Sequence, residues 1–92
     1  DEHDEQRTIE KQVGDKEYVL SCRLEVEYLN QEYDLDIEES EEYDTLAGYI
    51  INNYDGIPSS GTVIHTEKLE IKVLRTTRTR VELARVKVKK QK

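Results

Sequence analysis

Thiol and imidazole groups, which together can act as a nucleophile and its base in enzymes, occur only three times in this sequence, as Cys22, His3 and His65. A nucleophile–base pair needs the two side chains in contact and a third group to orient the imidazole. The spacing of Cys22 and His65 gives no indication that they meet. Ser59-Ser60-Gly61 lacks the glycine pattern of a nucleophile elbow and is typical of a turn. We therefore predict that Cys22 is a small buried residue, that His65 lies on the surface, and that the chain has no catalytic residue and is not an enzyme.

Two runs of carboxylates are the candidates for metal ligands, Asp1-Glu2-His3-Asp4-Glu5 and Glu38 to Glu42. Hard cations need several oxygens that converge on one point, usually from a loop bent by a glycine. Neither run has that spacing, so we interpret both as solvated charge and predict no metal site.

Anionic ligands would need glycine-rich loops or basic surfaces. The four glycines form neither a GxGxxG pattern nor a P-loop. The basic residues from Arg75 to Lys92 could attract nucleic acid, but all six tyrosines lie between Tyr18 and Tyr54, so base stacking is poorly served. We predict no nucleic-acid partner and interpret the basic residues as protection of an edge strand. Beneath a membrane, the same residues could contact anionic headgroups.

The length of 92 residues predicts one small domain without a deep cleft between lobes. Residues 1–56 hold 18 acidic and 4 basic side chains, and residues 57–92 hold 3 acidic and 10 basic. Such asymmetry indicates either a partner for each half or attraction between the halves of one fold, and we favour the second. One cysteine excludes an internal disulfide and suits a reducing compartment. No apolar run approaches the roughly 20 residues that cross a bilayer, so we expect the chain as given to be soluble.

The elements that must position these residues follow from hydrophobic periodicity. Residues 1–12 are almost entirely polar and predict a linker. A short strand over 18–22 follows, and then Val26, Leu29 and Tyr33 mark one face of a first helix. A second helix is predicted over 43–54, capped by Asp44 or Ser40, with a buried stripe of Leu46, Ala47, Ile50, Ile51 and Tyr54.

Gly56 suits a left-handed cap after the second helix, and Pro58 prevents its continuation. Three strands follow, over 62–66, 68–74 and 80–88. The third changes the parity of its apolar residues, which predicts a β-bulge near Leu83. The order β-α-α-β-β-β predicts an α+β two-layer sandwich, with a mostly antiparallel sheet and both helices on one face. The domain is expected over 13–89, between the linker 1–12 and a basic tail, 90–92.

Several segments, in order, resemble one known family. Tyr43-Asp44-Thr45-Leu46-Ala47-Gly48, then Gly56-Ile57-Pro58 and Gly61, are similar to the transporter-associated domain of the CorC/HlyC family. Tyr18 to Arg23 and Val26 to Asn30 resemble its upstream segments, although Ser21-Cys22 stands where the family often has Asp-Gly. The opening Asp1 to Glu5 is similar to the acidic segment that follows its pair of CBS domains.

The resemblance implies a non-catalytic C-terminal accessory domain of a bacterial, hemolysin-like membrane ion transporter, associated with magnesium and cobalt efflux. It implies a place on the cytoplasmic face of the inner membrane. The partners would be the CBS pair and the membrane domain of the same chain, a second copy in a homodimer, or an anionic membrane surface. The domain would act by docking and so modulate ion transport.

The residues that carry the motif are expected to have structural roles: Thr45, Leu46, Gly48, Gly56, Pro58 and Gly61. Thr45 is expected to fix the start of the second helix, and the glycines and proline to fix the turn into the sheet. No cofactor is expected. The alternative is a module that binds FAD or another adenine nucleotide, because the family's fold is similar to part of a PCMH-type FAD-binding fold, and the turn from Gly56 to Gly61 is where such a ligand would be sought.

Overall fold

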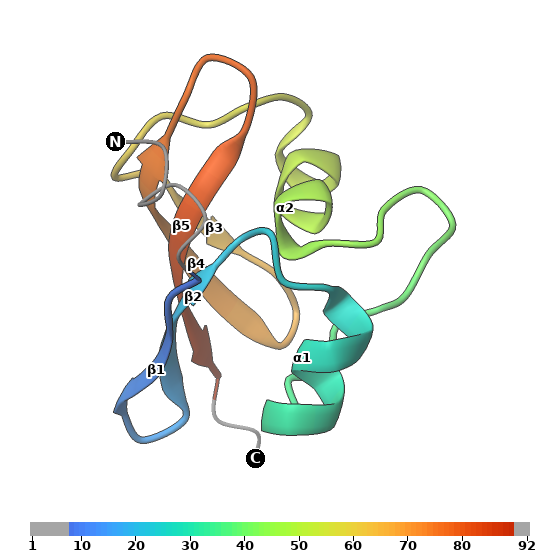
Figure 1. Ribbon diagram of the computed structural model, residues 1–92, viewed down its shortest axis with the longest axis vertical. Coiled ribbons are helices and arrows are strands. Elements are labelled where there is room, and N and C mark those ends of the chain that lie inside the picture. The colour runs from blue at the N-terminus through green and yellow to red at the C-terminus, as the bar shows by residue number, and fades with distance from the viewer. Residues whose placement is uncertain (1–7, 90–92) are drawn as a thin grey trace.

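The computed structural model describes residues 8–89, which fold into a five-stranded antiparallel sheet and two helices (Figure 1). In chain order the elements are β1 (Glu10–Gly14), β2 (Glu17–Ser21), α1 (Val26–Tyr33), α2 (Leu46–Tyr54), β3 (Val63–His65), β4 (Leu69–Thr76) and β5 (Val81–Val88). The strand order across the sheet is β1-β2-β5-β4-β3, so β5 is the central strand and β1 and β3 are the edges. No helix in residues 8–89 has the length and apolar character needed to span a membrane.

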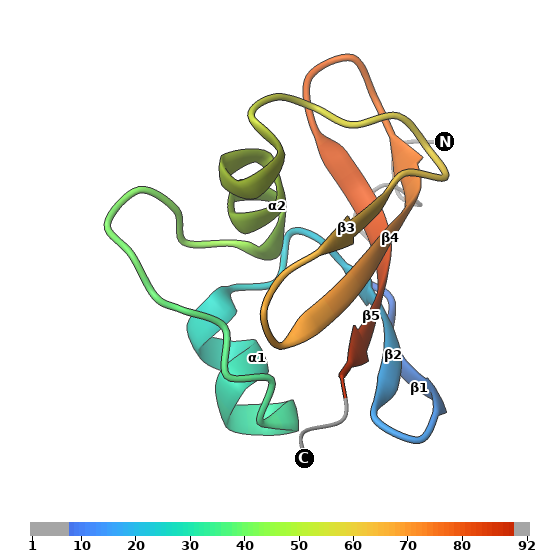
Figure 2. The same cartoon turned by 180° about the vertical axis from the view of Figure 1, so that it is seen from behind.

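Both helices lie on the same side of the sheet, as the two opposite views show (Figures 1 and 2). Alternation along each strand turns every second side chain toward this side. The core between the layers is formed by apolar side chains that are at most 8% exposed, among them Leu20, Leu29, Leu46, Ile50, Ile71, Val73, Ala84 and Val86. The predicted α+β architecture, with two helices on one face of the sheet, is confirmed.

The first helix follows its predicted face. Val26 and Leu29 are buried, and Tyr33 packs at the margin of the core. The helix ends at Asp34, whose φ of 56° is left-handed, and the Asn30 side chain both donates to and accepts from the backbone of Ile37. These two bonds hold the loop that carries the buried Leu35 and Ile37 against the core.

Strand β1 corrects the expectation that residues 1–12 form a linker, because Glu10 to Gln12 belong to the sheet. Its polar sequence gives no strand pattern, and it is held by backbone pairing with β2 and by the Ser21 hydroxyl, which accepts the Ile9 N–H at 2.7 Å. Residues 1–7 of the predicted linker and the predicted tail 90–92 lie outside the described residues.

Helix α2 begins at Leu46, three residues after the predicted start, and neither Asp44 nor Ser40 caps it. On its buried side Tyr49 is 7% exposed, whereas Tyr54, predicted as core, is 46% exposed. The left-handed residue at its C-terminus is Asp55, with φ 67°, rather than Gly56, whose φ is 137°.

The parity change in β5 has the predicted cause. Opposite β4 the register shifts twice, so that Leu74 on β4 and then Glu82 on β5 are each an additional residue. Val81 and Ala84 therefore both face the core although they are three residues apart. The predicted bulge near Leu83 is confirmed, one residue away at Glu82.

Candidate functional site

The start of α2 is the most densely hydrogen-bonded part of the family motif. The Thr45 hydroxyl accepts the Gly48 N–H at 3.2 Å, which caps the helix as predicted for this residue. Leu46, which has no exposed surface, donates its N–H to the Leu24 carbonyl at 2.9 Å. The next amide, of Ala47, donates to the carbonyl of Cys22, also at 2.9 Å. These bonds join α2 to the segment that leaves β2.

Gly48 is required by a close contact rather than by its backbone conformation. A Cβ at this position would lie 2.7 Å from the Cβ of Tyr43, a separation that real side chains do not reach. The ring of Tyr43 in turn packs edge-on against Tyr49, with centroids 5.4 Å apart. Gly48 therefore serves the packing of Tyr43 against α2, and it does not lie in the turn into the sheet.

The turn from Gly56 to Gly61 connects α2 to the sheet. Pro58 is buried, and Gly56 and Gly61 have φ of 137° and 93°, values that side chains other than glycine rarely adopt. The Gly61 N–H donates to Val73 at 2.7 Å, and the Gly56 N–H donates to Ile51 at 3.3 Å. These two amides therefore have partners within the domain and are not available to a phosphate group.

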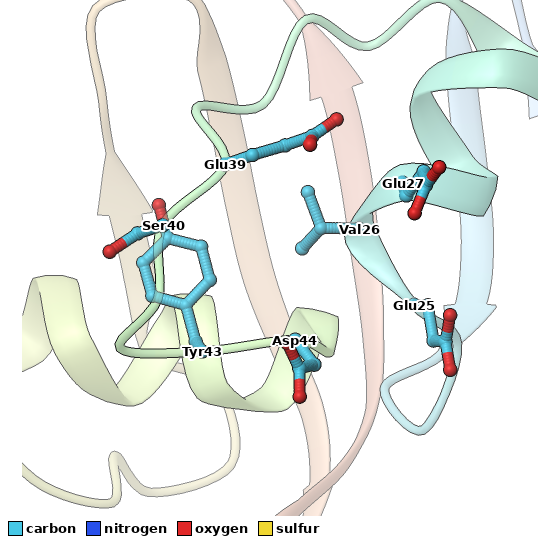
Figure 3. A pocket seen from close by; sticks show the side chains of 7 residues that line it. All are labelled: Glu25, Val26, Glu27, Glu39, Ser40, Tyr43 and Asp44. Carbon is cyan, nitrogen blue, oxygen red and sulfur yellow. The ribbon is translucent and has the colours of Figure 1, made fainter.

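An acidic groove lies between the start of α1 and the loop before α2 (Figure 3). Its volume is about 300 Å³, and it is lined by Glu25, Val26, Glu27, Glu39, Ser40, Tyr43 and Asp44. In Figure 3 the four carboxylates point in different directions and do not converge. Within residues 8–89, no group of three or more His, Cys, Asp or Glu side chains is arranged to hold a metal ion.

A second, wider groove lies between α2 and the turn that joins β3 to β4, with a volume of about 490 Å³. An ion pair between Lys68 and Asp36 lies on its lining. Asn52 and Asn53 also line it, and each uses its amide nitrogen within the domain, toward Glu42 and the Tyr49 carbonyl respectively. The groove is therefore lined mainly by polar side chains from the loop before α2, from α2 itself and from the turn between β3 and β4.

Cys22 and His65 lie where the sequence predicted. Cys22 has no exposed surface, and burial, followed by the charge of Glu82, raises the pKa of its thiol to about 12. A thiol in this state is a poor nucleophile at neutral pH. His65 is exposed on the edge strand β3.

One cluster was not predicted from the sequence. The hydroxyls of Tyr28 and Tyr33 on α1 both donate to Glu10 on β1, at 2.5 and 2.6 Å. These hydrogen bonds lower the pKa of the Glu10 carboxyl, and the bond to Glu10 raises the pKa of Tyr28 to about 12. Burial, and then the bond to Glu10, raises the pKa of Tyr33. No sequence signal could have revealed this clasp, because β1 itself has no strand pattern.

The sequence matches one family model and a curated relative. The model of the family described as "Transporter associated domain", CorC_HlyC, matches residues 11–90. A curated protein of Rickettsia canadensis named "Possible hemolysin C" is 28% identical over 97% of this chain. The chain spans only 31% of that relative's length.

Solved structures share the fold. A hemolysin domain from Enterococcus faecalis superposes with a TM-score of 0.77 at 26% identity, covering 89% of this chain and 99% of that one. A CorC-associated region from Neisseria meningitidis, whose name refers to Mg²⁺ and Co²⁺ transport, superposes at 0.78 with 21% identity, covering 87% and 98%. With the motif residues in place and the family model matched over most of the sequence, the chain belongs to the CorC_HlyC family of transporter-associated domains.

Proposed function

We propose that this domain is a non-catalytic accessory domain of a bacterial, hemolysin-like membrane ion transporter for Mg²⁺ or Co²⁺, and that it modulates transport by docking. Its partners are the CBS pair and the membrane domain of its own full-length chain, at the cytoplasmic face of the inner membrane. A second copy of the domain is a further partner of the same kind. Membership of the CorC_HlyC family and the names of its relatives support this setting.

The observation that carries the proposal is the contrast between a sealed core and an open groove. The only thiol is buried with a raised pKa, and the motif residues serve the packing of α2. The groove beside α2 is wide, open and lined by polar side chains from three segments. Such a surface suits contact with another protein domain, and a domain that docks differently in two transporter states shifts the balance between them.

The test uses the full-length transporter that contains this domain. Lys68→Glu in the second groove should alter Mg²⁺ or Co²⁺ export from cells, while the melting temperature of the 92-residue chain changes little because the ion pair is exposed. Lys16→Glu makes the same change of charge in the exposed turn between β1 and β2 and should leave export unchanged. Unaltered export after deletion of residues 13–89, or turnover by the purified chain, would contradict the proposal.

Binding of FAD or another adenine nucleotide is the alternative, and the internal bonds of the Gly56 and Gly61 amides weigh against a phosphate site in the turn that joins them. The same melting experiment covers it. A saturable rise in melting temperature on titration with FAD would support this alternative over the docking proposal.

A further inference from the structure

The sheet has a second face, and within residues 8–89 no helix covers it (Figures 1 and 2). Strand alternation places on this face the residues that alternate with the core. On β4 and β5 these include Lys72 and Arg85, which lie opposite each other in the strand register, and Lys87, which lies opposite Glu70. Lys72, Arg85 and Lys87 are all exposed. The open face is therefore the solvent side of a one-sided sheet.

The cations of this face outnumber the carboxylates that neutralise them. Arg85 forms an ion pair with Glu17, and Glu82 lies 3.5 Å from Arg75 and 3.9 Å from Arg80. Lys72, Arg78 and Lys87 form no ion pair with any residue between 8 and 89. These three side chains are thus not held in an ion pair within the described residues, although Lys87 lies opposite Glu17 and Glu70 in the strand register.

The hairpin between β4 and β5 extends this face beyond the rest of the sheet, at the top of Figure 1. A backbone bond from the Thr77 N–H to Arg80, 2.8 Å long, closes its turn, and Arg78 lies exposed within it. None of the large exposed apolar residues belongs to the hairpin turn. Contact made by this turn is electrostatic and does not involve insertion into an apolar phase.

The opposite layer has the opposite charge. The segment from Cys22 to Gly56, which contains both helices, holds 11 acidic residues and one basic residue. Near a negatively charged surface, the open sheet face is attracted and the helix layer is repelled. Only one orientation of the domain is then favourable.

We propose that the open face of the sheet, with Lys72, Arg78 and Lys87, binds the anionic phospholipid headgroups of the membrane beside the transporter. This inference rests on the proposed function, which puts the domain at the membrane. Arginine forms paired hydrogen bonds with phosphate, and each cation near an anionic leaflet adds attraction. The face has no aromatic side chain among its cations, which disfavours single-stranded nucleic acid as the ligand. In this orientation both grooves of the helix layer face away from the lipid, toward protein partners.

The experiment is flotation of the 92-residue chain with lipid vesicles at low salt. We expect binding to vesicles that contain phosphatidylglycerol, none to phosphatidylcholine alone, and loss of binding as salt shortens the screening length. Lys72→Gln, Arg78→Gln and Lys87→Gln should each weaken binding about fivefold, and together about a hundredfold.

Lys68→Gln is the matched control, because it removes the same charge from the lining of the second groove. It should change binding less than about twofold. No binding to anionic vesicles, or an equal loss in Lys68→Gln and in the three test variants, would overturn the inference. Binding of an RNA oligonucleotide more tightly than anionic vesicles at the same salt would also overturn it, since the face would then serve nucleic acid. So would a wild-type chain that is a dimer in solution and a triple variant that is a monomer, since the face would then bind a second copy.

The two proposals fail separately. If Lys68→Glu alters ion export but the chain does not bind anionic vesicles, the membrane contact is wrong and the docking proposal remains. If the domain binds anionic vesicles but its deletion leaves ion export unchanged, the docking proposal is wrong instead.

Discussion

At the scale of single residues, Gly48 shows most clearly how the family motif determines packing. An alanine in the middle of a helix ordinarily gains up to about 1 kcal/mol over glycine. At Gly48 the added Cβ would lie 2.7 Å from the Cβ of Tyr43, whose position is fixed by its own backbone. We expect Gly48→Ala to lower the free energy of unfolding by about 1–3 kcal/mol despite its better helix propensity. Urea denaturation measures the difference.

Gly14→Ala is the matched control for this prediction. A Cβ at Gly14 would meet the Oε1 of Glu17 at 3.0 Å, the far end of a flexible side chain that can shift by a few tenths of an ångström while its other oxygen keeps the ion pair with Arg85. Its effect should stay within about 0.5 kcal/mol. A Gly48→Ala variant as stable as Gly14→Ala would mean that Tyr43 moves aside, and that the glycine has another role.

At the scale of elements, the clasp of Glu10 by Tyr28 and Tyr33 attaches the edge strand β1 to α1. The pKa of Glu10 is lowered in the folded state, so its contribution to stability is present above the carboxyl's ordinary pKa of 4.5 and is lost as pH falls through the lowered value. The pKa of Tyr28 is raised to about 12, so its contribution is present below pH 10 and is lost as pH rises through about 12.

Glu10→Gln should therefore lower the free energy of unfolding by roughly 0.5–1 kcal/mol at neutral pH, and by less in acid. Thermal melts from pH 7 to pH 3 give this difference. Glu27→Gln removes an exposed carboxylate from α1 and is the control. Its effect on the free energy of unfolding should not decrease from pH 7 to pH 3. If Tyr28→Phe combined with Tyr33→Phe leaves the effect of Glu10→Gln unchanged, the clasp does not form in solution.

The same elements show how far the sequence predicts this fold. The alternation of Leu69, Ile71 and Val73 and the period of Val26 and Leu29 identify β4 and α1, because local geometry alone places these residues on one face of each element. Strand β1 could not be predicted, since it is held by pairing with β2 and by hydrogen bonds to Tyr28 and Tyr33, 18 and 23 residues away from Glu10, rather than by its own pattern.

The predicted start of α2 was wrong for a related reason. Tyr43 and Asp44 have the composition of a helix start, yet a bridge between Thr45 and Glu25 and the Val26 N–H donated to Asp44 hold them extended. The role of Thr45 at the start of α2 was predicted from the motif, whereas the contact of Gly48 with the Tyr43 side chain was not. The two grooves were not, because residues far apart in sequence line them.

At the scale of the whole molecule, Cys22 reports on the cohesion of the two layers. It has no exposed surface, its N–H donates to Glu82 on β5, and its carbonyl accepts from Ala47 on α2. A thiol reagent should therefore reach it only when sheet and helices separate together. For a domain with ordinary stability, labelling by a disulfide reagent should be slowed about a thousandfold or more relative to the unfolded chain.

Ser60→Cys in a Cys22→Ala background places a thiol on an exposed turn and should react at once. Labelling of Cys22 at a rate that urea does not accelerate would mean that the end of β2 opens locally, and that the layers do not act as one cooperative unit.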